Sequence, residues 1–139
     1  MKIYLAARFG RWEELEKYAA DLVALGHTVT SRWHRREYAQ MNAQNDADHT
    51  HEQGQAWANE DLEDIRQADL MISFTEKSLS ATGSRGGRHV EFGVALALNK
   101  VVCIVGPREH VFHHLVLKYR DWAAFLVAFI MESWEESVN

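Results

Sequence analysis

The chain has 139 residues, a formal net charge of −5 and a hydrophobic content of 47%. These values are typical of one globular domain spanning residues 1–139 and exclude a disordered chain. The negative charge argues against binding to a nucleic acid polymer or an anionic membrane. Cys103 is the only cysteine, which excludes a disulfide within the chain. No apolar run approaches the roughly 18 residues that a membrane span requires, so we expect a cytoplasmic protein.

The first elements alternate between strand and helix. Residues 2–6 form an apolar run that predicts a short buried strand. Residues 11–25 carry apolar side chains at helical spacing, and Gly26 is a natural end for that helix. Residues 27–30 predict a second strand. A strand, a helix and a strand in succession favour a parallel sheet with right-handed crossovers.

The middle of the chain changes character. Arg, His, Asn, Gln and Asp dominate residues 32–55, which we interpret as an insertion or lid over one edge of the sheet. Helical spacing resumes over residues 56–68, and residues 69–74 predict a third, apolar strand. A polar loop follows at residues 75–84.

The last third completes the expected sheet. A glycine-rich turn leads into a helix that ends at Leu98, and residues 100–105 predict a fourth strand. Residues 115–119 are a candidate fifth strand, and residues 121–135 a final amphipathic helix. The sum is an open α/β parallel sheet of about five strands with helices on both faces. Ligands bind such sheets at the carboxyl ends of the strands, so the segments that follow the strands must supply the site.

The glycine-rich turn is the first candidate site. Gly86 and Gly87 allow backbone N–H groups to approach a ligand closely, and the start of a helix adds partial positive charge. Glu91 falls in roughly the first turn of this helix, where the helix dipole keeps a carboxylate ionised. We therefore expect Glu91 to be an anionic nucleophile. The alternative is a surface glutamate that stabilises a helix N-terminus.

A second carboxyl group, Asp61, supplies the complementary chemistry. Asp64 lies three positions ahead on the same helix face, and a like charge at that spacing favours protonation of one partner. A carboxyl that stays protonated near neutral pH can act as a general acid. The alternative is an ordinary solvated acidic face. One ionised and one protonated carboxyl are what cleavage of a glycosidic bond requires, about 5 Å apart in a retaining enzyme.

Short motifs in a fixed order carry a resemblance to a known family. They are Ile3–Ala6, Glu60–Leu62 with Ile65 and Ala68–Asp69, and Gly86–Gly87 followed by Glu91–Gly93 and Ala95. Together they resemble the nucleoside 2-deoxyribosyltransferase superfamily, which includes the 2'-deoxynucleoside 5'-monophosphate N-glycosidases. The resemblance runs from Met1 to about Val105 and leaves residues 32–55 unmatched.

The resemblance implies a flavodoxin-like fold and a set of catalytic roles. Glu91 would form a covalent deoxyribosyl intermediate, Asp61 would handle the nucleobase, and Tyr4 would orient Glu91. Water or a second base would then resolve the intermediate. We expect no cofactor. A protein of the same fold that binds or senses a nucleotide without turning it over is the alternative.

Arginine positions favour a nucleotide over a free nucleoside. The nucleoside transferases carry a carboxylate near the position of Arg85, where a guanidinium suits a phosphate. Ser84 and the amides of Gly86 and Gly87 would complete a phosphate cradle, as in the nucleotide hydrolases.

The loop after the first strand adds further candidates. Arg8 and Arg11 lie where the nucleotide hydrolases also hold phosphate. Phe9 and Trp33 are candidates for stacking on a base, although burial in the core is the alternative for either ring.

Three other predictions concern metal ions, other chemistries and assembly. The pairs His49/His51 and His110/His113–His114 lack a framework of known metal-ligand spacing, so we predict no metal site. The apolar surroundings of Cys103 argue against a nucleophilic cysteine, and no dinucleotide-binding glycine fingerprint follows the first strand. The last helix has more apolar positions than one sheet contact uses, which predicts a homo-oligomer.

Overall fold

A computed structural model of the chain describes residues 1–38, 49–77 and 86–138. Its centre is a five-stranded sheet in the order β2-β1-β3-β4-β5 with every neighbouring pair parallel. The strands are β1 (Lys2–Ala6), β2 (Thr28–Val29), β3 (Leu70–Phe74), β4 (Val101–Val105) and β5 (Leu117–Tyr119). This order is that of flavodoxin-like proteins, so the predicted fold class is confirmed.

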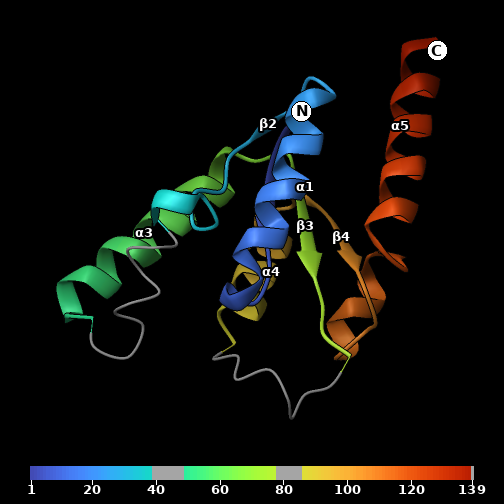
Figure 1. Cartoon of the computed structure of the whole chain (residues 1–139). Coiled ribbons are helices and arrows are strands. Elements are labelled where there is room, and N and C mark those ends of the chain that lie inside the picture. The colour runs from blue at the N-terminus through green and yellow to red at the C-terminus, as the bar shows by residue number, and fades with distance from the viewer. Residues whose placement is uncertain (39–48, 78–85, 139) are drawn as a thin grey trace.

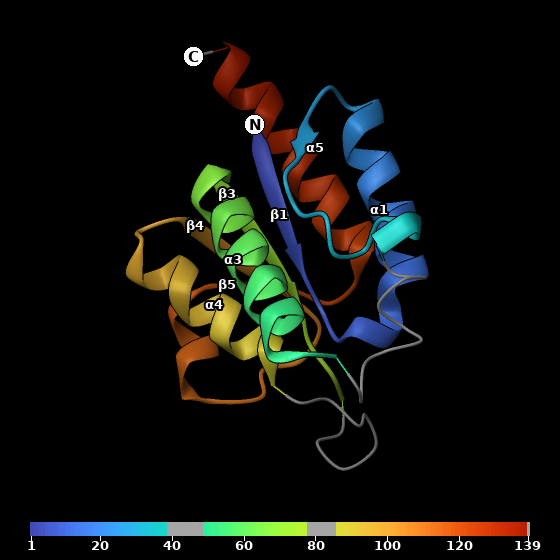
Figure 2. The ribbon, with the colours of Figure 1, turned by 90° about the vertical axis from the view of Figure 1, so that its left-hand side faces the viewer.

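Helices cover both faces of the sheet (Figures 1 and 2). One layer holds α1 (Trp12–Ala24) and α5 (Trp122–Val138), and the other holds α3 (His51–Gln67) and α4 (Gly87–Ala97). Two short 3-10 helices, η1 (Phe9–Arg11) and η2 (Val111–Leu115), follow β1 and β4. Figure 2 shows the sheet between the two layers, with α3 and α4 side by side on one face.

Alternation along the strands divides the core in two. Side chains of successive strand residues point to opposite faces of a sheet. Ile3 and Leu5 of β1 therefore pack with α1 and α5, whereas Tyr4 and Ala6 pack on the α3/α4 face. The same alternation recurs in β3 and β4. Tyr4 is thereby directed towards α4, the helix that carries Glu91.

The predicted insertion is shorter than expected. Helix α3 begins at His51, not at residue 56, because Thr50 and Gln53 form a reciprocal capping box at its N-terminus. The first turn is exposed and polar, so apolar spacing gave no signal there. Residues 39–48, the rest of the predicted lid, lie outside the described residues. The predicted strands are present within two residues of the expected bounds, but η2 was not predicted.

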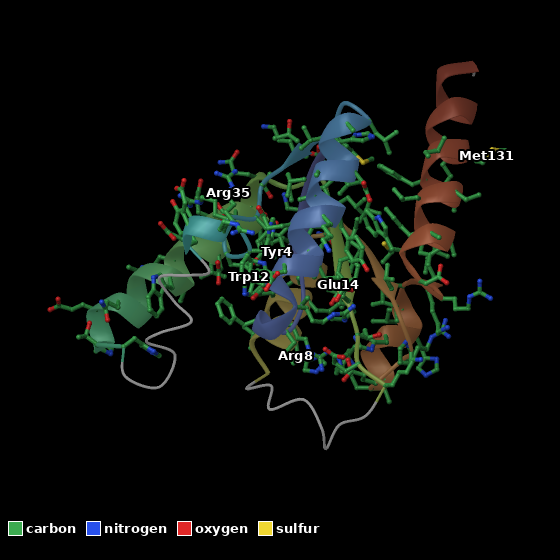
Figure 3. All side chains as sticks on the ribbon, viewed as in Figure 1. Tyr4, Arg8, Trp12, Glu14, Arg35 and Met131 are labelled. Atoms are coloured by element: carbon green, nitrogen blue, oxygen red, sulfur yellow. The ribbon has the colours of Figure 1, made fainter. Side chains whose placement is uncertain are left out.

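Helix α5 has one buried and one exposed apolar side. Trp122, Phe125 and Phe129 are buried against the sheet. Val127, Ile130 and Met131 are exposed, and Figure 3 shows Met131 on the side of α5 turned away from the sheet. The homo-oligomer expected from this helix stays a prediction, which sedimentation at micromolar concentration tests. Among the described residues, no helix is long and apolar enough to cross a membrane.

Candidate active site

A tyrosine and a glutamate from different elements form the centre of the site. The hydroxyl of Tyr4 on β1 donates a hydrogen bond of 2.6 Å to Oε2 of Glu91 on α4. Tyr4 is fully buried, and its position is fixed by the strand register that pairs it with Met71 of β3. A rigid strand thus holds the donor, and the first half of α4 presents the carboxylate.

The electrostatic state of Glu91 differs from the expectation. Burial raises the pKa of Glu91 to about 8, the negative charge of Asp61 adds to this, and the Tyr4 hydrogen bond acts in the opposite direction. The helix begins at Gly87, so Glu91 is its fifth residue and lies beyond the first turn, where the dipole acts. The prediction that the helix start keeps Glu91 ionised is therefore wrong for the ligand-free site, because desolvation dominates.

Asp61 is electrostatically coupled to this pair from helix α3. Its side chain is half-buried, and burial raises its pKa to about 7, with smaller contributions from the charges of Asp64 and Glu60. Its charge in turn raises the pKa of both Glu91 and Tyr4. The like-charge effect expected from sequence is present, but burial is the larger cause.

Arg32 is a cation that acts on the pKa of Asp61. No role in the site was predicted for it from the sequence. It lies in the segment after β2 and binds the buried carboxylate of Asp64, with Nη2 and Oδ1 2.9 Å apart. A longer contact of 3.7 Å reaches Glu60. Arg32 lowers the pKa of Asp61, opposing the effect of burial. Its position after a strand end was the available signal, but its partner lies 32 residues away.

The two arginines expected to hold phosphate already have carboxylate partners. Nε of Arg8 lies 3.1 Å from Glu76, at the carboxyl end of the sheet (Figure 3). Arg11 binds both oxygens of Glu14, at 2.9 and 2.7 Å, and stacks over the ring of Phe74. Phe74 belongs to the α1/α5 side of the core, so Arg11 lies on the face opposite Tyr4 and Glu91. The structure does not bring Arg11 to the carboxylate pair.

That face has a cavity of its own. Its volume is about 490 Å³, and Arg11 lines it together with Thr75, Gly106 and Trp122. A phosphate bound to Arg11 there would lie across the sheet from Glu91. Glu76, the partner of Arg8, also lines this cavity, and its Oε1 lies 3.7 Å from Nη1 of Arg11.

The glycine-rich turn is described only in part. Gly86 has a φ of 88° and precedes the first residue of α4, a left-handed conformation that favours glycine. Among the described residues, a Cβ atom added to Gly86 or Gly87 would meet no atom within 4 Å. Ser84 and Arg85 lie outside the described residues.

The two candidate stacking residues are neighbours. The ring centroids of Phe9 and Trp33 are 6.3 Å apart, and both side chains are half-buried. The indole N–H of Trp33 donates to the carbonyl oxygen of Leu5 at 2.7 Å, which fixes the ring above the end of β1. The structure therefore groups these aromatics beside the first strand, where each retains an exposed edge.

A second hydrogen-bonded set has the composition of a hydrolase triad. Ser31 Oγ lies 2.6 Å from His34 Nε2, and His34 Nδ1 lies 2.7 Å from Glu16. Ser31 also accepts the backbone N–H of Leu5. Ser31 is 0% and His34 1% exposed, although both residues line a cavity of about 950 Å³. We interpret this set as the bonds that attach the segment after β2 to β1 and α1.

The fold and the coupled carboxyl groups define a flavodoxin-like protein with a candidate acid–nucleophile site. No protein-family model and no curated protein matches the chain. Among solved structures, the CMP N-glycosidase BcmB of Clostridium botulinum matches with a TM-score of 0.57 and 19% identity, over 94% of this chain and 99% of that chain. A 2-deoxyribosyltransferase of Bacillus psychrosaccharolyticus matches with a TM-score of 0.61 and 24% identity, over 88% of each chain. Both names match the family that the sequence motifs resemble, and at these identities the likeness confirms the resemblance at the level of the fold alone.

Proposed function

We propose that this protein cleaves the N-glycosidic bond of a nucleoside or deoxynucleoside 5'-monophosphate through a covalent glycosyl intermediate on Glu91. The observation that carries the proposal is the 2.6 Å hydrogen bond from Tyr4 to Glu91, with Asp61 electrostatically coupled to both residues. The fold shared with an N-glycosidase and a deoxyribosyltransferase supports it.

The protonation states available to the carboxyl pair suit this chemistry. With pKa values of about 7 for Asp61 and about 8 for Glu91, the pair holds one proton between these values, mainly on Glu91, and the reaction requires that proton to move to Asp61. Two coupled groups share that proton, so the pair and not either residue is the titrating unit. A substrate that develops positive charge at C1' favours the microstate with Glu91 ionised and Asp61 protonated.

The reaction then proceeds in two displacements. A Glu91 carboxylate oxygen attacks C1', the C1'–N bond breaks, and the departing base takes the proton of Asp61. Asp61, now ionised, accepts a proton from water as the water oxygen attacks C1', and the C1'–O bond to Glu91 breaks. A second base in place of water gives transfer. Tyr4 holds Glu91 in one rotamer throughout both steps.

The choice of a monophosphate rests on Arg8. Its guanidinium lies at the carboxyl end of β1, where a phosphate would have to displace or share it with Glu76. Phe9 and Trp33 beside the same strand end are the candidate base-stacking residues. Replacing Glu76 with Gln removes the competing anion, and we expect it to lower the KM for a monophosphate while leaving the KM for the free nucleoside unchanged.

The test is release of free base from a panel of purine and pyrimidine nucleosides and 5'-monophosphates, in ribose and deoxyribose forms. We expect turnover of at least one monophosphate, and mass spectrometry of acid-quenched protein to show a glycosyl adduct on Glu91. Saturable binding with no base released from any compound would overturn the proposal in favour of a nucleotide-binding sensor.

A further inference from the structure

Three histidines, on or next to helices α4 and η2, lie close together. His89 lies on α4, His110 immediately precedes η2, and His113 lies within η2. Each offers a ring nitrogen, and the three nitrogens lie within 4.8 Å of one another. The rings of His110 and His113 are stacked with centroids 3.8 Å apart, and His89 lies 4.8 Å from His110. The sequence argument considered His110 and His113 and missed His89, which is 21 residues earlier.

The ring nitrogens of this cluster are not fully satisfied. Nε2 of His110 contacts Nδ1 of His89 at 3.1 Å. Within the described residues, Nε2 of His113 and Nδ1 of His110 are buried and have no hydrogen-bond partner. His113 is 0% exposed. Because Nδ1 of His113 accepts a hydrogen bond, its buried Nε2 carries the proton in this tautomer, and Nε2 can bind an ion only when that proton moves to Nδ1.

We propose that His89, His110 and His113 form a binding site for a divalent transition-metal ion such as Zn²⁺. Imidazole nitrogen is a preferred ligand of this class of ion, and three histidines with a fourth position for water are a known coordination set. Nδ1 of His89, one ring nitrogen of His110 and Nε2 of His113 would be the ligand atoms. Zn–N bonds of about 2.0–2.1 Å place tetrahedral ligand nitrogens about 3.3 Å apart, so nitrogens as far as 4.8 Å apart must approach by up to about 1.5 Å.

A carboxylate lies near the second ring nitrogen of one proposed ligand, His89. Oε1 of Glu109 lies 4.0 Å from Nε2 of His89, the nitrogen that would carry the proton when Nδ1 binds the ion. Carboxylates in this position orient metal-bound histidines. Glu109 is itself held by Arg88 through both carboxylate oxygens, so the positive charge of that guanidinium is neutralised beside the site.

Binding has a structural consequence that can be measured. The backbone N–H of Glu109 donates to Nδ1 of His113 at 2.9 Å. A neutral imidazole that binds an ion through Nε2 carries its proton on Nδ1, which then cannot accept this hydrogen bond. Ion binding therefore breaks the Glu109–His113 contact. The ion would also join η2 to α4, and so brace the helix that presents Glu91, independently of the reaction proposed above.

Titration of untagged, chelator-treated protein with Co²⁺ and Zn²⁺ tests the site. We expect one equivalent of Co²⁺ to give visible absorption bands, Zn²⁺ to displace it, and the amide resonance of Glu109 to shift. His110→Ala and His89→Ala should each weaken binding at least tenfold. His89 is half-exposed on a helix surface, so its variant tests the site even if substitution of buried His113 prevents folding.

His114→Ala is the matched control, because His114 is exposed on η2 and outside the cluster. It should bind the ion like the parent protein. Absence of binding at 100 µM Co²⁺ and Zn²⁺, or binding that survives both His89→Ala and His110→Ala, would overturn the proposal. Neither outcome bears on base release, which the panel of nucleotides measures separately.

Discussion

Glu91 on helix α4 and Glu109, which binds Arg88 of the same helix, are two glutamates whose pKa values are shifted in opposite directions. Burial works to raise the pKa of both. The hydrogen bonds and charge of Arg88 outweigh it at Glu109 and lower that pKa, whereas Glu91 has a tyrosine partner and the nearby charge of Asp61, and its pKa rises to about 8. The contrast teaches that the cation, more than the depth of burial, decides whether a carboxylate is held ionised or left free to change its charge.

The largest expected effect is a loss of activity on substituting Glu91 that substituting Glu109 does not cause. Glu91→Gln removes the nucleophile, so we expect base release to fall at least about a thousandfold while nucleotide binding and thermal stability persist. Glu109→Gln should instead lower stability, because it leaves the buried guanidinium of Arg88 without its counter-charge. Steady-state kinetics with calorimetric binding and melting curves distinguish the two. Equal losses of activity in both variants would break the comparison.

The second effect concerns the ion pair itself. Arg88→Met leaves Glu109 buried without a cation, and we expect unfolding to become easier by about 3–5 kcal/mol. Arg108→Met is the control, since Arg108 is exposed, and should change stability by less than about 0.5 kcal/mol. Urea denaturation of both variants measures the difference. A stable Arg88→Met protein would mean that the pair contributes little to the fold.

The third effect concerns the tyrosine partner. Tyr4→Phe removes the hydrogen bond that favours ionised Glu91, so the pKa of Glu91 should rise further. We expect a 10- to 100-fold loss of kcat, roughly the contribution of one positioned hydrogen bond. The pH–rate profile, a bell with limbs near 7 and 8 in the parent, should shift to higher pH.

The matched control lies on the opposite face of the sheet. Tyr18 donates a 2.7 Å hydrogen bond to Glu14, the same pair of groups at a similar distance. Tyr18→Phe should leave both kcat and the pH profile unchanged. A profile that moves equally in the two variants would indicate a general loss of structure.

The smallest effect is on stability. The folded state raises the pKa of Glu91 from 4.5 to about 8, so it binds more protons than the unfolded chain, and stability falls as the pH rises between these values. Glu91→Gln lacks this loss. At pH 9 we expect the variant to have the higher unfolding free energy, and at pH 4 we expect the two proteins to differ little. An advantage of the same size at both pH values would contradict the assignment.

Strand and helix patterns made the architecture predictable. The apolar runs of β1, β3 and β4 are continuous because both faces of a parallel strand are covered, which is a strong local signal. The start of α3 was missed because its first turn is polar and its capping box gives no apolar period.

Motif order could suggest residues for the candidate site, and their roles stay predictions, whereas their energetics could not be predicted from the sequence. Tyr4, Asp61 and Glu91 came from motif order, and the structure places them in one electrostatic unit. The predicted ionisation state of Glu91 was wrong because burial raises its pKa. Burial depends on tertiary packing, which an argument from the helix dipole does not take into account. The pairing of Arg32 with Asp64, and of His89 with His110, joins segments far apart in the chain.

The left-handed backbone of Gly86 has a consequence for chemical synthesis of the protein. Among the described residues, an alanine of natural chirality there would meet no atom within 4 Å, and its left-handed backbone conformation alone costs about 1 kcal/mol. The mirror-image enantiomer, D-alanine, prefers positive φ. Compared with glycine, it also lowers the conformational entropy of the unfolded chain. Ligation of a peptide bearing that single inverted centre would thus stiffen the entrance to α4 where genetically encoded substitution can only strain it.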